Sequence, residues 1–291
     1  MPFADEIAAQ PDCWRGAAAL ATRLSRVLPP RGARVAVVGC GTLLLVGQAI
    51  AALREAAGLG ETDAFPASEF PAGRRYDLVV ALSRSGTTSE VIAAVDALPR
   101  AVTTLAVTAS GGTPLAARCD RTIVLDFADE RSVMQTAFAT TTLALVRAHL
   151  GHAIEPVAAD GERALDAVLP GADDGLGAVA FLGTGWRVGL AREAALKVRE
   201  AAALPSEAHP ALEYRHGPIS AAGPGTLVWA IGPIPGDLEA DVLRTGAAVE
   251  RSAHDPMAEL VRVQRFAAAA ARARGRDPDH PPHVSRSVLL S

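Results

Sequence analysis

Short apolar runs alternate along the chain with longer stretches of helical periodicity. The apolar runs lack the polar alternation of half-exposed strands, which is typical of strands buried on both faces of a parallel sheet. Helical stretches between such strands predict an α/β fold. In the first part of the chain, the predicted strands are residues 34–39, 77–82, 103–108 and 121–125, and the predicted helices are residues 43–57, 88–98 and 132–150.

The same order of elements starts again in the second part of the chain. A strand there ends in Gly183-x-Gly185, 144 positions after Gly39-x-Gly41 (183 − 39), and each turn leads into a helix that contains Arg-Glu-Ala. We therefore expect two similar halves, joined around residues 151–176. The predicted strands of the second half are residues 178–182 and 226–231, and its helices are residues 187–203, 236–244 and 260–274.

Composition narrows the class of protein. With 49% hydrophobic and 21% charged residues, a chain of 291 residues can bury a sizeable core, which excludes a disordered or fibrous protein. A net charge of −4 without a basic cluster argues against a nucleic-acid partner. The N-terminal segment does not have the pattern of a secretory signal, and no apolar run approaches the roughly 18 residues of a membrane span. We expect a cytoplasmic protein that contacts no membrane.

The sequence predicts neither a nucleotide cofactor nor a metal. The dinucleotide fingerprint needs Gly or Ala three residues after the second Gly of each Gly-x-Gly turn, where this chain has Leu44 and Val188. The three cysteines, Cys13, Cys40 and Cys119, follow no metal or redox spacing. The paired histidines near residues 150 and 280 lack carboxylate or thiol companions at ligand spacing.

A segment rich in hydroxyl groups follows the second predicted strand. Residues 83–90 read Ser-Arg-Ser-Gly-Thr-Thr-Ser-Glu and lead into a helix. Hydroxyls, a glycine and free backbone N–H groups at a helix N-terminus form an anion site, so we expect this turn to bind a phosphate group. The alternative is an ordinary helix cap formed by Thr87 or Thr88 with Glu90. Without a Walker lysine, a small phosphorylated metabolite is favoured over a nucleoside triphosphate.

The single lysine of the chain lies in the first helix of the second half. Of 28 basic residues only Lys197 is a lysine, and Lys, unlike Arg, can lose its proton. Glu193, Lys197 and Glu200 stand at i, i+4 and i+7 and share one helix face. An exposed ion pair is the alternative. In the first half the positions 144 residues earlier are Ala49, Leu53 and Ala56, which favours a polar cleft made for chemistry.

His216 is the candidate for proton transfer outside this helix. It precedes Gly217-Pro218, a pair typical of a short rigid turn, and imidazole titrates close to neutral pH. A structural role for this histidine is the alternative.

These motifs together resemble the sugar isomerase (SIS) domain family. The likeness is to the isomerase half of glutamine-dependent glucosamine-6-phosphate synthase and to stand-alone amino-sugar-phosphate deaminases and isomerases. It rests on the Gly-x-Gly-Thr turn at 39–42, the SxSGxT loop at 83–88, the E-x-x-x-K-x-x-E helix, the RHGP turn and the tail DPDHPPHVSRSV. It implies an α/β fold of two tandem flavodoxin-like, three-layer halves with parallel sheets, at residues 22–157 and 165–291.

The resemblance also implies an enzyme without a glutaminase domain. Its substrate would be a hexose or hexosamine 6-phosphate, interconverted between aldose and ketose forms by ring opening and carboxylate-mediated proton transfer, with ammonia released from an amino sugar. A homodimer with a shared active site is expected. A non-catalytic sugar-phosphate sensor that regulates a partner protein stays open as an alternative. N-acetylmuramate-phosphate etherases share the fold, but they are not expected to carry this helix with an RHGP turn.

The family's functional residues transfer to matching positions of this chain. Glu200 would move the proton, Lys197 would stabilise the sugar oxygens, Glu193 would assist, and His216, supplied by the partner subunit, would open the ring. Arg286 replaces the tail lysine that forms an imine in the synthase, and a guanidinium cannot form one. Leu43 replaces a serine of the synthase. The substrate-binding positions are Thr42, Ser83, Arg84 (through its backbone), Ser85, Gly86, Thr88, Gln135, Thr136 and Arg286.

Overall fold

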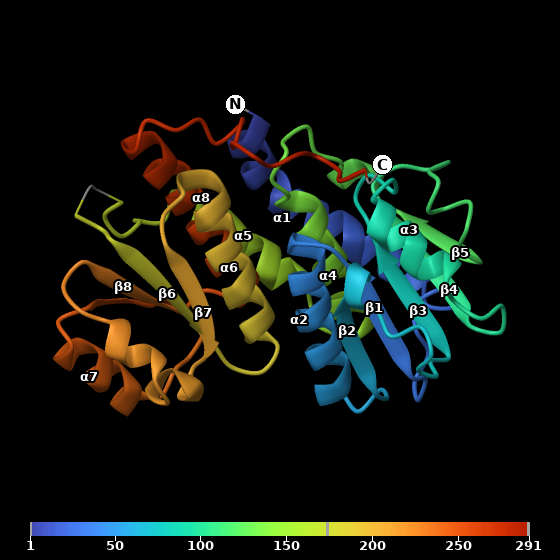
Figure 1. The fold of residues 1–291 in the computed structure, drawn as a ribbon, viewed down its shortest axis with the longest axis horizontal. Coiled ribbons are helices and arrows are strands. Elements are labelled where there is room, and N and C mark those ends of the chain that lie inside the picture. The colour runs from blue at the N-terminus through green and yellow to red at the C-terminus, as the bar shows by residue number, and fades with distance from the viewer. Residues whose placement is uncertain (1, 173–174, 290–291) are drawn as a thin grey trace.

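Two parallel sheets form the framework of the computed structural model, which describes residues 2–172 and 175–289 (Figure 1). The first sheet has five strands in the order β2-β1-β3-β4-β5, and the second has four in the order β7-β6-β8-β9. The α/β fold with parallel sheets is thus confirmed. The predicted second half, residues 165–291, includes residues 173–174 and 290–291, which lie outside the described residues.

The sequence fills these sheets with short, largely buried strands. Their central members are apolar along their whole length, as expected where helices cover both faces. The strands are β1 (Val35–Gly39), β2 (Thr62–Pro66), β3 (Leu78–Leu82), β4 (Thr103–Thr108), β5 (Arg121–Val124), β6 (Ala178–Gly183), β7 (Ser206–Pro210), β8 (Thr226–Ile231) and β9 (Ala248–Glu250).

Helices connect the strands and cover the sheets. The α-helices are α1 (Pro2–Arg23), α2 (Thr42–Ala56), α3 (Ser89–Asp96), α4 (Ala137–His149), α5 (Glu155–Asp166), α6 (Arg187–Ala202), α7 (Gly236–Arg244) and α8 (Pro256–Ala273). Short 3-10 turns are η1 (Ala67–Glu69), η2 (Asp126–Ala128), η3 (Leu212–Arg215) and η4 (Pro218–Ala221). Within the described ranges, no helix is long and apolar enough to cross a membrane.

Two predicted helices begin elsewhere. The helix expected from residue 132 begins at Ala137, because residues 132–136 form a loop whose end is capped by the Glu130 carboxylate. The helix expected from residue 260 begins at Pro256, where the Asp255 side chain accepts a hydrogen bond from the Met257 N–H. The prediction also missed α1, α5 and the strands β2, β7 and β9.

The helices divide the buried side chains into one large core and two smaller ones. α3 covers the outer face of the first sheet, where Val95 joins a cluster with Val38, and α7 covers the second sheet, where Val242 joins Val228. The large core fills the space between the sheets and contains residues of α1, α2, α4, α6 and α8. Figure 1 shows α2 and α6 side by side in this central layer.

α2 and α6 approach one another closely at Gly189. A Cβ atom at this position would lie 2.6 Å from the Leu45 carbonyl oxygen and 2.7 Å from the Ala49 backbone nitrogen. One turn further along α6, the Arg192 guanidinium donates to Gln48 Oε1 at 2.6 Å, across a separation of 144 residues. Gly189 and Leu45 are also 144 apart, so the two helices that match in the sequence repeat meet at matching positions.

This crossing predicts that Gly189→Ala destabilises the fold. Inside an ordinary helix, Ala is about 1 kcal/mol more favourable than Gly. Here its methyl group meets backbone atoms of α2, so we expect the free energy of unfolding in urea to fall by about 1–3 kcal/mol. Gly73→Ala is the control, since a Cβ there meets nothing within 4 Å, and it should change stability by less than about 0.5 kcal/mol. A Gly189→Ala protein as stable as the parent would contradict the close approach.

Candidate active site

A pocket of about 700 Å³ opens at the carboxyl ends of β1 and β3. α2 leaves β1 toward one face of the sheet and α3 leaves β3 toward the other, which makes this point the usual ligand position of an open parallel sheet. Seven of the predicted site residues line the pocket: Thr42, Arg84, Ser85, Thr88, Gln135, Glu200 and Arg286. Sequence positions up to 244 residues apart thus meet in one cavity.

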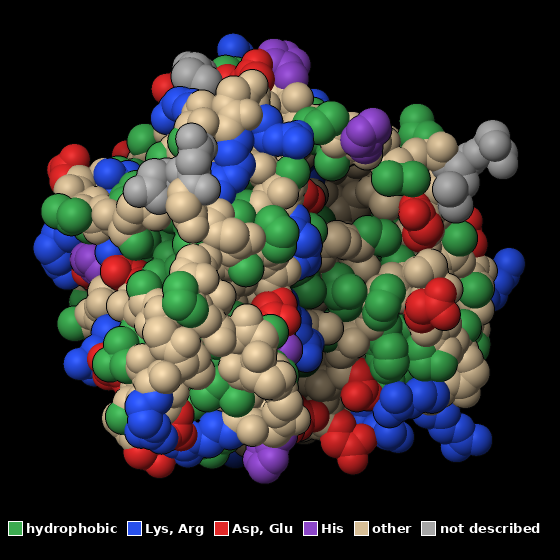
Figure 2. Space-filling model, turned by 60° about the vertical axis from the view of Figure 1, so that its left-hand side comes forward, with side chains coloured by type: hydrophobic (Ala, Val, Ile, Leu, Met, Phe, Trp, Pro, Cys, Tyr) green, Lys and Arg blue, Asp and Glu red, His purple; other side chains and the backbone are tan. Residues whose placement is uncertain are grey.

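Figure 2 shows one face of the molecule, hollowed between two lobes, with basic and acidic side chains intermixed along the hollow. A separate cavity lies in the core beside α2 and α4 and has an almost entirely apolar lining, including Val37, Ile50 and Leu145. It contains none of the predicted site residues. Among the described residues, no group of three His, Cys, Asp or Glu side chains is arranged to hold a metal ion.

The loop after β3 is shaped by Ser83 and Gly86. The Ser83 hydroxyl is buried, accepts a hydrogen bond from the Gly86 N–H at 3.1 Å and lies 3.1 Å from Thr88 Oγ1. Gly86 has a φ of +63°, and a Cβ there would lie 2.2 Å from Thr113 Oγ1, so only glycine fits. These two residues hold the loop, whereas Ser85 and Thr88 line the pocket at the start of α3.

The C-terminal tail lies across this loop, as Figure 1 shows near the label C. Ser287 Oγ is 3.0 Å from Thr87 Oγ1 and 3.3 Å from Ser85 Oγ, and the Ser89 N–H donates to the Val288 carbonyl at 3.3 Å. The predicted substrate residue Arg286 lines the pocket, and its guanidinium donates to Asp129 Oδ1 at 2.8 Å. A tail hydroxyl therefore joins the hydroxyls of the loop, a contact that the sequence did not reveal.

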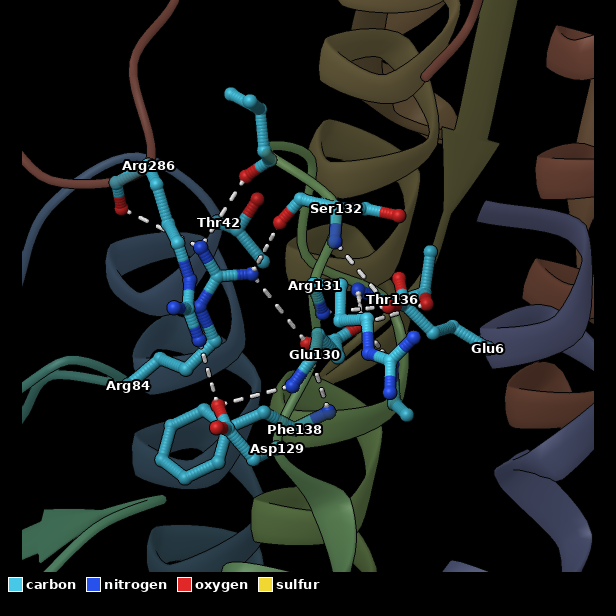
Figure 3. Close-up of polar contacts among 12 residues, drawn as sticks. Glu6, Thr42, Arg84, Asp129, Glu130, Arg131, Ser132, Thr136, Phe138 and Arg286 are labelled. Atoms are coloured by element: carbon cyan, nitrogen blue, oxygen red, sulfur yellow. Dashed lines mark hydrogen bonds and ion pairs between the residues drawn. The ribbon is translucent and has the colours of Figure 1, made fainter. Parts of the chain in front are cut away.

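Residues 130–136 form the next wall. Thr136 is turned away from the pocket, since its N–H and Oγ1 both donate to Glu130 Oε1, at 2.6 and 2.7 Å. Gln135 lines the pocket, and its buried Oε1 has no hydrogen-bond partner among the described residues. Glu6 of α1 holds the segment from outside by accepting from the backbone N–H groups of Arg131 and Ser132 (Figure 3).

The side chain of Arg84 has a role that sequence reasoning missed. It is 2% exposed, and its guanidinium donates to the Ser132 carbonyl at 2.9 Å and the Arg286 carbonyl at 3.3 Å. Its nearest carboxylate is Glu130, at 3.8 Å. A lone Glu in a loop gives no sequence signal for burial, and neither does an Arg expected to act through its backbone.

The helix with the single lysine forms a wall beside α2. Lys197 Nζ lies 2.5 Å from Glu200 Oε2 and 3.5 Å from Glu193 Oε1, so the predicted shared face is confirmed. Lys197 is 0% and Glu193 1% exposed, which rules out the exposed surface pair. Thr42, at the start of α2, donates to Glu193 Oε1 at 3.3 Å. Of the three charged residues, only Glu200 lines the pocket.

Burial and mutual attraction set the charges of this group. Burial raises the pKa of Glu193 to about 7, against the attraction of Lys197, which lowers it. Burial also opposes the charge of Lys197, but the attraction of Glu193 and Glu200 outweighs it and raises the Lys197 pKa. Lys197 therefore stays protonated at neutral pH, and its ammonium group donates to the carboxylate at the pocket wall.

His216 lies outside the pocket of its own chain. It follows η3 and is exposed, and its backbone N–H donates to the Glu213 carbonyl at 2.9 Å. The structure thus brings together the loop at residues 83–88, Glu200 of α6 and the tail, but not this histidine.

Comparisons with known proteins agree with this geometry. The SIS domain family matches residues 31–150, which contain the whole first sheet and the loop at residues 83–88. The glutamine–fructose-6-phosphate aminotransferase (isomerizing) of Aeropyrum pernix is 29% identical over 267 residues, covering 73% of this chain and 43% of the relative. The chain spans about half the length of the curated relatives it matches, at most 52%.

Solved structures match along nearly the whole chain. Glucosamine-6-phosphate deaminase from Thermotoga maritima has a TM-score of 0.83 and 25% identity, with 100% of both chains covered. Tagatose-6-phosphate ketose/aldose isomerase from Escherichia coli has a TM-score of 0.80 and 22% identity, with 100% of this chain and 96% of that one covered, a likeness of fold. Residues 31–150 thus match the SIS domain family, and the chain is similar in fold to glucosamine-6-phosphate deaminase along its whole length.

Proposed function

We propose that the protein is a sugar-phosphate aldose-ketose isomerase or an amino-sugar-phosphate deaminase, acting on a hexose or hexosamine 6-phosphate in the cytoplasm without a bound cofactor. The observation that carries this proposal is that Glu200 lines the same pocket as Ser85 and Thr88 of the hydroxyl-rich loop. One end of the pocket suits an anion and the other offers a carboxylate for proton transfer.

The loop at residues 83–88 binds the phosphate group. The half-buried hydroxyls of Ser85, Thr87 and Thr88 and the N-terminus of α3 supply hydrogen-bond donors to an anion. In the structure, Ser85 and Thr87 instead bond the hydroxyl of Ser287. Phosphate oxygens accept these hydrogen bonds when substrate is bound. Thr42 lies across the pocket, and Gln135 faces the sugar hydroxyls with a free carbonyl oxygen.

Glu200 transfers a proton between C1 and C2, one of which is the carbonyl carbon and the other its neighbour. It removes the proton from C2 of the open-chain aldose and returns it to C1, giving the ketose. With an amino sugar the same shift gives a C2 imine, which water hydrolyses to the ketose and ammonia. Lys197 does not line the pocket in this geometry, so we assign it to holding Glu200, with Glu193 behind both. Arg286 forms no imine, because a guanidinium stays protonated.

We infer that the chain consists of two tandem halves, residues 22–157 and 165–291. The contacts of Gly189 with Leu45 and of Arg192 with Gln48 support this reading, since both join positions 144 apart. The first half supplies the loop at residues 83–88, and the second supplies Glu193, Lys197 and Glu200 of α6, together with His216 and the tail.

The ring-opening step belongs to His216 of a second subunit. The exposed position of His216, away from the pocket of its own chain, supports delivery to the pocket of a partner in a homodimer.

A panel of substrates tests the function. The protein is incubated with the 6-phosphates of glucosamine, galactosamine, fructose and tagatose, and ammonia and sugar products are followed together. Ammonia indicates a deaminase, and aldose-ketose interconversion without ammonia an isomerase. We expect Glu200→Gln to lower turnover by about 10²–10⁴-fold, the usual contribution of general acid-base catalysis, with binding retained.

Glu61→Gln is the matched control for this variant, because Glu61 is exposed and forms an ion pair with Arg34 at the surface, and it should leave turnover unchanged. Undiminished turnover in Glu200→Gln would refute the role of that carboxylate. Tight binding of a sugar phosphate without any product would refute the enzyme and establish the sensor.

Subunit complementation tests the placement of His216. Glu200→Gln and His216→Asn are each expected to be inactive on the cyclic substrate. In mixed dimers isolated through two different affinity tags, one of the two sites has both native residues, so about half of the native activity should return. Mixed dimers without activity would show that both residues belong to the site of one chain.

A further inference from the structure

A fully buried ion pair lies beneath the three segments that surround the pocket. Arg84 follows β3 and Glu130 precedes the loop at 132–136, and their side chains are 1% and 0% exposed. Figure 3 shows the pair between this loop and the tail. Removing two charges from water costs several kcal/mol per ion. The attraction between the charges offsets this cost only when further hydrogen bonds satisfy both groups.

The Arg84 guanidinium donates hydrogen bonds to two other segments, the 132–136 loop and the C-terminal tail. One guanidinium nitrogen donates to the Ser132 carbonyl at 2.9 Å, and the other donates to the carbonyls of Val133 at 3.4 Å and Arg286 at 3.3 Å. The phosphate loop, the 132–136 loop and the tail are thus joined at one side chain.

Glu130 caps the N-terminus of α4 and so holds the end of the 132–136 loop. Its two oxygens accept from the N–H groups of Thr136, Ala137 and Phe138, at 2.6, 2.8 and 3.2 Å, and from Thr136 Oγ1 at 2.7 Å. Arg84 is the nearest cation to this carboxylate, while the Glu6 carboxylate acts on it by repulsion. Both ends of the 132–136 loop are therefore fixed, the first by Arg84 and the second by Glu130.

The loop held in this way carries two hydrogen-bonding groups without partners in the described part of the chain, and one of them, on Gln135, lies at the pocket. Ser132 Oγ and Gln135 Oε1 are buried and have no partner among the described residues. Buried polar atoms cost free energy unless a partner arrives, which indicates that a ligand supplies it.

We propose that Arg84 and Glu130 are positioning residues that hold the 132–136 loop and the tail against the phosphate loop, and so set the affinity for the sugar part of the ligand. This inference rests on the proposed function, because it takes the ligand to be a sugar phosphate. The phosphate loop has its own internal bonds through Ser83 and Gly86, so phosphate binding does not depend on the pair.

The test compares two ligands in one variant. By calorimetry, Glu130→Gln should lower the affinity for hexose 6-phosphate about tenfold or more relative to the affinity for inorganic phosphate. The control is Glu259→Gln. Glu259 is also 1% exposed, accepts from Arg262 at 2.7 Å and Trp229 Nε1 at 2.5 Å, and lines no part of the pocket. The Glu259→Gln variant should be less stable than the native protein, but the ratio of its affinities for hexose 6-phosphate and inorganic phosphate should stay native.

A ligand-free measurement separates this inference from the proposed function. Amide hydrogen exchange over residues 131–138 should rise at least about tenfold in Glu130→Gln and in Arg84→Lys, whose ammonium cannot reach both segments at once, but not in Glu259→Gln. An unchanged affinity ratio, a parallel loss for both ligands, or unchanged exchange would overturn the positioning role. If the native protein binds neither ligand, the proposed function fails, and with it the ligand part of this inference.

Discussion

The ammonium group of Lys197, buried between two carboxylates, is the constraint on which the site depends. It lies where α6 meets α2, and the two helices come close because Gly189 has no side chain. An unpaired charge there would cost several kcal/mol, and Glu200 at 2.5 Å and Glu193 at 3.5 Å offset that cost. Glu193 is enclosed with Thr42 against it, which leaves Glu200 as the member of the group that faces the pocket.

The two ends of the pocket are built on different physical principles. The proposed phosphate end uses hydroxyls, backbone N–H groups and a helix N-terminus, and the hydroxyls of Ser85, Thr87 and Ser287 bond one another. Its nearest buried cation, Arg84, is engaged with backbone carbonyls and Glu130. The opposite end is formed by the ionic group of Glu193, Lys197 and Glu200, which lies where α6 crosses α2. Both arise at the carboxyl ends of parallel strands, where loops from distant parts of the chain converge.

Much of this arrangement could be predicted from the sequence. The buried strands have unbroken apolar runs, the phosphate loop has a dense group of hydroxyls, and Glu193, Lys197 and Glu200 share a face by spacing alone. Edge strands such as β2 are half-buried and mixed in composition, so they leave no clear pattern. The start of α4 depends on Glu130 and the tail contact on Ser287, and these tertiary contacts have no local signature.

The central claim is that a carboxylate in this pocket carries a proton between neighbouring carbons of a sugar phosphate. The most direct measurement is NMR of a hexose 6-phosphate that the protein converts in ²H₂O. The account predicts that deuterium appears at C1 or C2 during turnover, because a proton held by Glu200 exchanges with solvent before it returns. Conversion with complete retention of the original hydrogen at both carbons would contradict it.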